Sequence, residues 1–152
     1  RFKLSTPVIG TINRKMAVAR FGRTLGTLLE SGVPLLTSLE IAKNVVGNSR
    51  IADAVQKASD EVREGQSLSL PLARSGLFPP IATEMIGVGE QSGNLEQMLY
   101  KIADAYEKEV ESNVTTMTSM LEPVMILVMG LIVGFIVVSI LLPIFEMNQL
   151  VR

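Results

Sequence analysis

The side chains of this chain allow only a narrow range of chemistry. Its 152 residues include no His and no Cys, so the commonest general base, the thiolate nucleophile and the soft metal ligands are all absent. Asp and Glu oxygens are what remain for a metal ion. A formal net charge of −1 and an aromatic content of 5% do not favour a nucleic-acid surface. We predict no enzyme activity, no cofactor and no nucleic-acid partner.

One glycine-rich segment, residues 87–93, resembles a binding loop at first sight. It follows a helical pattern and lacks the Lys-Ser/Thr ending of a nucleotide loop, so we do not expect it to hold phosphate. A cation bound by Glu90, Ser92 and backbone oxygens stays open, although one carboxylate makes a weak site and we predict no metal. We favour a structural motif, in which a helix ends in glycine and a new helix is capped by asparagine. Its residues are Gly87, Gly89, Glu90, Ser92, Gly93 and Asn94.

A basic run near the N-terminus is the second candidate site. Its four cations are Arg14, Lys15, Arg20 and Arg23. The run is either a solvated face near anionic membrane lipid or a docking face for an acidic partner, and the two interpretations are compatible. We predict partner binding here.

The elements that would position these residues include one strong membrane signal. Residues 124–145 form 22 consecutive positions without a charge, and 16 of them are Leu, Ile, Val or Phe. About 20 residues of helix cross the hydrocarbon layer. Those 16 side chains favour insertion by about 5–10 kcal/mol before the Gly, Ser and Pro penalties. We predict a transmembrane helix over 123–145.

Polar and small residues mark special positions in and beside this helix. Gly130 and Gly134 form a Gly-x-x-x-Gly pair, which either allows another helix to pack closely or reflects ordinary glycine use in membrane helices. Glu122 lies at the expected water boundary, and Pro123 begins a new helix or kinks a continuous one. Ser139 is the one intramembrane polar side chain, which disfavours a conducting path.

Six helical patterns fill the rest of the chain, with no strand signal. We expect an extended lead over 1–10, a helix over 14–30 capped by Asn13, and further helices starting near 34, 49, 67, 80 and 95. Gly22 and Gly26 are expected to be close packing points. For the fifth helix we expect Ile81, Met85 and Val88 to face inward. The sixth helix has no breaker before Pro123, so it can continue into the membrane.

The predicted fold is therefore all-α, a six-helix antiparallel bundle followed by one transmembrane helix. We expect a lead segment over 1–12, a helical-bundle domain over 13–122, the membrane helix over 123–145 and a tail over 146–152. Because lysines and arginines near membrane helices are retained inside, the basic run places the bundle in the cytoplasm.

The chain resembles the family of the type II secretion system F protein (GspF), which also includes the PilC platform proteins of type IV pili. The matching residues are the stretch from Met16 to Leu35, the segment from Gly87 to Leu95, Glu122-Pro-Val-Met-Ile126 and Leu142-Pro-Ile-Phe145. The resemblance covers essentially the whole chain. The tail Asn148-Gln-Leu-Val151 favours the secretion branch.

This resemblance implies an inner-membrane platform protein of a type II secretion system that couples a cytoplasmic assembly ATPase to pseudopilus assembly and protein export. The alternatives are a type IV pilus platform protein and, less favoured, a channel-forming transport subunit. Implied partners are the ATPase, pseudopilins, other inner-membrane components and further copies of itself. The chain would be the second cytoplasmic domain and last membrane helix of a multi-pass protein, with two membrane helices missing upstream.

Overall fold

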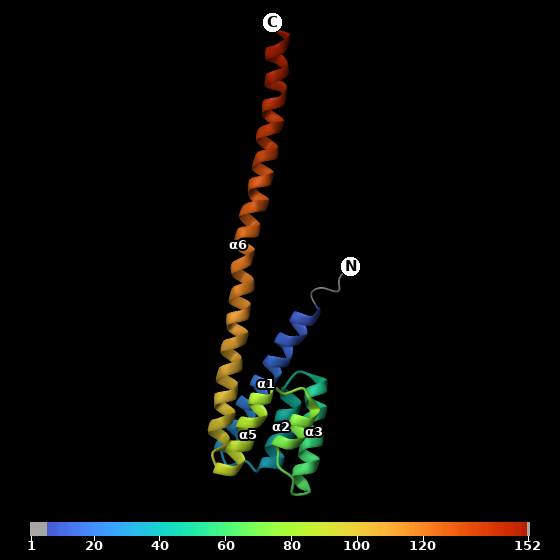
Figure 1. Cartoon of the computed structure of the whole chain (residues 1–152), viewed down its shortest axis with the longest axis vertical. Helices are drawn as coiled ribbons and strands as arrows, with labels where there is room; N and C mark the ends of the chain where they lie inside the picture. The colour runs from blue at the N-terminus through green and yellow to red at the C-terminus, as the bar shows by residue number, and fades with distance from the viewer. Residues whose placement is uncertain (1–5, 152) are drawn as a thin grey trace. The chain divides into compact units, whose positions relative to one another are not determined.

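The computed structural model describes the backbone of residues 6–151 and the side chains of residues 9–151, and within them it contains helices and turns but no strand. The all-α prediction with six helices is confirmed. The helices are α1 (Thr6–Glu30), α2 (Leu35–Val45), α3 (Ser49–Arg63), α4 (Ser69–Ser75), α5 (Pro80–Ser92) and α6 (Leu95–Leu150) (Figure 1). They divide into a compact unit over 1–111 and a second unit over 112–152.

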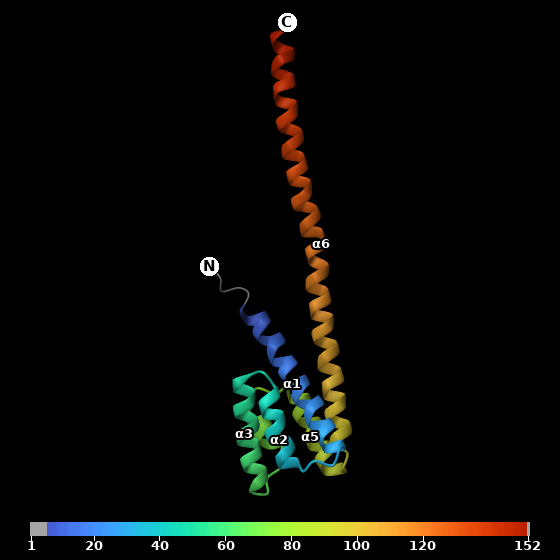
Figure 2. The same ribbon diagram turned by 180° about the vertical axis from the view of Figure 1, so that it is seen from behind.

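The first unit is a bundle of α1 to α5 and the beginning of α6. Helices α1, α2 and α3 run alternately down and up, and both views show α2 beside α3 (Figures 1 and 2). Helix α4 packs on α3 and α5. The core takes side chains from all six helices, and its largest fully buried members are Phe21, Leu25, Leu39, Ile51, Leu68, Leu72, Ile86 and Leu99.

Local chemistry accounts for most helix boundaries. Asn48 caps α3, since its Oδ1 accepts hydrogen bonds from the backbone N–H groups of Arg50 at 3.0 Å and Ile51 at 3.2 Å. Gly93 ends α5 with a φ of +75°, a left-handed conformation in which glycine has no Cβ to strain.

The predicted start of the first helix was wrong. Helix α1 begins at Thr6, so Asn13 lies inside it and is not its N-cap, and residues 6–10 are not an extended lead. Pro7 is tolerated because the N–H groups of a helix's first turn have no partner within the helix. Residues 1–5 of that lead lie outside the described part of the chain.

The predicted inward face of α5 was also wrong in part. Ile81 and Val88 are exposed, at 62% and 53% of their surface, and only Met85 is partly buried. The buried positions include Ala82, Ile86 and Gly89, one residue further along the helix. A Cβ on Gly89 would lie 2.9 Å from the Cα of Leu95, so the close contact with the next helix sets this face.

The beginning of α6 buries one apolar face in the bundle. Leu99, Ile102, Tyr106 and Val110 are buried, and Leu95 packs partly buried against the core. The helix assignment continues without a break to Leu150, with Pro123 and Pro143 inside it. The predicted membrane segment is therefore part of α6 rather than a separate helix after it.

The second unit, 112–152, is the apolar end of α6. An 18-residue window of the helix has a mean hydropathy of 3.1 with none of it buried, so its length and composition suffice to cross a membrane. Ser139 donates its hydroxyl to the carbonyl oxygen of Phe135 at 2.8 Å, which satisfies it within its own helix. A Cβ on Gly130 or Gly134 would meet no atom within 4 Å, so this face is open.

Candidate partner-binding face

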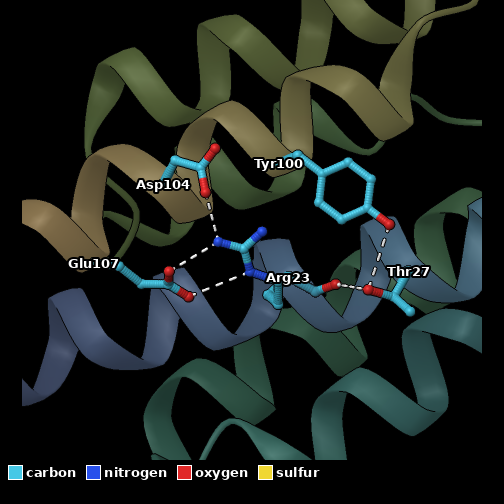
Figure 3. Close-up of polar contacts among 5 residues, drawn as sticks. All are labelled: Arg23, Thr27, Tyr100, Asp104 and Glu107. Atoms are coloured by element: carbon cyan, nitrogen blue, oxygen red, sulfur yellow. Dashed lines mark hydrogen bonds and ion pairs between the residues drawn. The ribbon is translucent and has the colours of Figure 1, made fainter.

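The basic run lies on α1, and the structure divides its four cations into two pairs. Arg23 and Lys15 turn toward the beginning of α6, which carries acidic side chains. Lys15 forms an ion pair with Glu109. Arg23 donates from Nη2 to Asp104 Oδ1 at 2.6 Å and to Glu107 Oε2 at 2.8 Å, and from Nε to Glu107 Oε1 at 3.3 Å (Figure 3).

The geometry around Arg23 is that of a guanidinium fork. Two of its nitrogens meet both oxygens of Glu107, an arrangement that a lysine cannot reproduce. The hydrogen bonds from Glu107 and then Asp104 raise the pKa of Arg23 further above its ordinary value. The guanidinium carbon also lies 5.8 Å from the centre of the Tyr100 ring, within the range of a cation–π contact.

Tyr100 extends this contact between α1 and α6. Its hydroxyl donates to the carboxylate of Glu30 and lies 3.4 Å from Thr27 Oγ1. The Glu30 hydrogen bond raises the pKa of Tyr100, because a carboxylate acceptor favours the protonated phenol. We call the set of Lys15, Arg23, Glu30, Tyr100, Asp104, Glu107 and Glu109 the α1–α6 seam.

Two glycines bring the helices close enough to form this seam. A Cβ on Gly22 would lie 2.9 Å from the carbonyl oxygen of Leu99, closer than real Cβ contacts allow. A Cβ on Gly26 would lie 3.3 Å from a ring carbon of Tyr100. The expectation that these glycines are close packing points is confirmed.

The other two cations of the run point away from the seam into solvent-exposed surroundings. Arg14 and Arg20 are exposed, and neither forms an ion pair with any residue that the structure describes. Arg20 lies over the turn between α2 and α3, where a Cβ on Gly47 would be 2.9 Å from its Nη1. Of the four cations in the run, Lys15 and Arg23 are thus held by ion pairs within the bundle, whereas Arg14 and Arg20 form none among the described residues.

The glycine-rich segment has a role that the sequence did not indicate. Glu90 accepts two backbone hydrogen bonds, from Leu68 N–H at 2.9 Å and Ser69 N–H at 3.0 Å. Helix α4 has no side-chain cap of its own, so Glu90 of α5 caps it from another helix. Gly87 permits this approach, because a Cβ there would lie 3.3 Å from Ser69 Oγ.

The rest of the segment forms the turn into α6. Ser92 ends α5, and Asn94 donates its N–H to Gly89 O at 3.0 Å while its own carbonyl accepts from Met98 N–H at 3.2 Å. Both oxygens of Glu90 are engaged by backbone donors. Among residues 6–151, no three Asp or Glu side chains gather in a way that would hold a metal.

Glu122 and Pro123 lie inside α6, in the second unit, and Glu122 is exposed. The first unit and the second unit thus share one helix whose composition changes from charged to wholly apolar around these residues.

Comparison with known proteins finds one family. Residues 21–143 match the family described as "Type II secretion system (T2SS), protein F". The chain is 45% identical to the type IV pilus assembly protein PilC of Thermus thermophilus over 96% of its own length and 36% of that protein. It is 44% identical to the type II secretion system protein F of Pseudomonas aeruginosa, over 99% of the chain and 37% of that protein. The chain thus spans little more than a third of the length of these relatives.

Proposed function

The chain belongs to the type II secretion system protein F family, and from this premise we propose that it is part of an inner-membrane platform on which pilin-like subunits are assembled. The predicted family is confirmed. The proposed platform role is one for full-length members of the family, and this chain spans 36–37% of the two relatives named above.

The observation that carries the proposal is helix α6. Its first four turns contribute Leu99, Ile102 and Tyr106 to the bundle core, and its later part holds the apolar window able to cross a membrane. A helix shared in this way suits a scaffold that joins a cytoplasmic domain to the inner membrane. In our proposal the bundle lies in the cytoplasm, 123–145 spans the membrane, and 146–152 faces the periplasm.

The mechanism we propose is mechanical rather than chemical. The α1–α6 seam and the Gly22 contact hold the beginning of α6 tightly to the bundle, so force applied to the bundle reaches the membrane helix. An ATPase would supply the force and the platform would pass it to the subunit being extracted. Neither step needs a catalytic residue in this chain.

The family has a secretion branch and a pilus branch, and percent sequence identity does not assign this chain to either. The relatives named for pilus assembly are 38–45% identical, and those named as secretion system protein F are 40–44% identical. We propose the secretion branch, on the tail residues 148–151, with the pilus branch as the alternative. We do not favour a channel role, because the hydroxyl of Ser139 already donates to a carbonyl oxygen of its own helix and is not held toward a water-filled path.

A deletion experiment tests the platform role. Removing the gene that encodes this chain should abolish export of cargo, or of pili, and should release the assembly ATPase from the membrane fraction. The intact gene should restore both. Normal export and normal ATPase recruitment in the deletion strain would contradict the proposal.

A second experiment tests the partner-binding face. We propose that Arg20, exposed and unpaired among the described residues, contacts an acidic surface of a cytoplasmic partner. Arg20→Glu in the full-length protein should reduce co-purification of the ATPase at least fivefold. Lys101→Glu is the matched control, since Lys101 is also exposed and unpaired but lies on α6. Equal losses in the two variants would exclude a specific dock at Arg20.

A further inference from the structure

An open hollow of about 390 Å³ lies in the first unit where α1 meets the beginning of α3. The volume falls within the range of small-ligand pockets, about 300–1,000 Å³. Its side chains come from three separate segments of the chain. They are Thr11, Asn13 and Arg14 of α1, Asn48 and Arg50 at the start of α3, and Leu77 of the connector between α4 and α5.

The hollow is positively charged and contains no carboxylate. Its two arginines are 36 positions apart in sequence and are brought together only by the fold. Both are exposed, and neither makes an ion pair with a residue in the described part of the chain. Two exposed guanidinium groups that line one hollow, neither held in an ion pair, give that hollow a positive potential that attracts an anion.

Amide groups complete the donor set. The Oδ1 of Asn48 is occupied by the capping bonds to Arg50 N–H and Ile51 N–H, so its side-chain NH₂ is the group left to donate. Asn13 lies one residue before Arg14 on the same wall and adds a second amide. The N–H groups of Arg50 and Ile51 are already bonded to Asn48, so they are not counted among the donors.

A neighbouring hollow differs from this one because acidic side chains line it. It shares Arg50 and Leu77 but is also lined by Asp53 and Glu61, and Glu61 already pairs with Arg74 at 2.5 Å. Its charges are mixed and partly neutralised. The hollow beside Arg14 is the one of these two that presents cations and amide donors alone.

We propose that this hollow binds a phosphate-bearing anion, with the Arg14 and Arg50 guanidinium groups as its charged ligands. Guanidinium forks match phosphate oxygens in bidentate geometry, and amides supply the remaining donors. The phosphate comes either from a phospholipid headgroup or from a soluble phosphate ester. The site differs from the docking face at Arg20 and does not depend on the platform role.

The test uses the full chain purified in a neutral detergent. Inorganic pyrophosphate is titrated by calorimetry, and phosphatidylglycerol retained by the chain is counted by native mass spectrometry against phosphatidylcholine. The variant Arg14→Gln/Arg50→Gln should bind at least tenfold more weakly. Lys101→Gln/Lys108→Gln removes the same charge from exposed positions of α6 and should bind like the wild type.

The outcomes separate the sources. Arginine-dependent binding of phosphatidylglycerol alone supports a headgroup site, and arginine-dependent binding of pyrophosphate supports a soluble ester. Binding of neither probe, as expected if the arginines serve an acidic protein instead, overturns the proposal, as does equal loss in both double variants. If the arginine double variant does not keep its wild-type circular dichroism, Arg14→Gln alone is used, with at least a threefold loss expected and unchanged binding contradicting the proposal.

Discussion

Glu90 acts on a helix other than its own, and its removal should be costly. Its carboxylate accepts the N–H groups of Leu68 and Ser69, and no other side chain caps α4. Glu90→Gln keeps the shape but replaces a charged acceptor of two bonds by a neutral amide with one oxygen. We expect a loss of about 1–2 kcal/mol, measured by thermal unfolding in detergent.

The control for Glu90 lies on the same helix. Glu84 is exposed and has no partner among the described residues, so Glu84→Gln makes the same charge change without removing a cap. It should change stability by no more than about 0.5 kcal/mol. Equal destabilisation by the two variants would show that Glu90 acts through charge alone.

The two tyrosines should both ionise at a higher pH in the folded chain than in the unfolded chain. The hydrogen bond to Glu30 raises the pKa of Tyr100, and burial raises that of Tyr106, above the ordinary value of 10.0. Because the pKa of each tyrosine is higher in the folded chain, the neutral phenol stabilises the folded state below about pH 10. This contribution to the free energy of unfolding is lost as the pH rises through the folded pKa. Absorbance of tyrosinate should therefore appear above pH 10 in the folded chain, and near pH 10 in guanidinium. Folded chain that titrates at pH 10 would contradict this.

At the residue scale, the sequence indicated the cations but not their partners. Lys15 lies seven positions before Gly22, so the two share one face of α1, and Gly22 marks the face that meets α6. That spacing could have assigned Lys15 and Arg23 to the α1–α6 seam. The capping role of Glu90 had no such signal, since Glu90 and Ser69 are 21 residues apart and meet only through packing.

At the scale of elements, two glycines of α1 should respond oppositely to the same substitution. Gly22→Ala places a Cβ 2.9 Å from a backbone oxygen of α6, which must shift, so we expect a loss of about 1–3 kcal/mol. Gly10→Ala meets nothing within 4 Å in the same helix and should gain up to about 1 kcal/mol from helix propensity. Thermal unfolding of the two variants measures the difference, and a shift of the same sign would contradict the contact.

At this scale the presence of each helix was predictable from the sequence, but the face that each helix buries was not always predictable. The starts of α2 and α3, predicted near residues 34 and 49, agree with the structure because helix start signals are local. The face of α5 was misjudged by one position because its apolar residues lie on more than one side, and the contact of Gly89 with Leu95 decides which side is buried. The start of α1 was missed because residues 1–10 show no clear helical period and proline disfavours helix at the residue before it, although a first turn accepts proline.

At the scale of the whole molecule, composition alone divided the chain in two. The absence of charge over 123–145 indicated an apolar helix long enough to cross a membrane, since an apolar run of that length is recognised without tertiary information. The boundary between compact units falls earlier, after Glu111, because side-chain burial on α6 ends at Val110. The meeting of Arg14 and Arg50 could not be predicted, since it depends on how three helices pack.

The early unit boundary makes a prediction about truncation. A chain ending at Glu111 keeps every buried side chain of the bundle and should unfold cooperatively, as a soluble domain, in a circular dichroism melt. A chain ending at Gly93 loses Leu99, Ile102 and Tyr106, all at most 6% exposed. Burial of each such side chain is worth about 1.5–3 kcal/mol, so their loss removes much of a typical stability of about 5–15 kcal/mol.

The shorter chain should therefore show no cooperative transition and should aggregate on gel filtration, because removal of α6 uncovers part of the apolar core. A chain ending at Phe145 is the control with both units present. If the Gly93 truncation melted as sharply as the Glu111 truncation, α6 would be an appendage to a five-helix bundle. Its role in passing force from the bundle to the membrane would then lose its physical basis, since a helix that stabilises nothing in the bundle is not held by it.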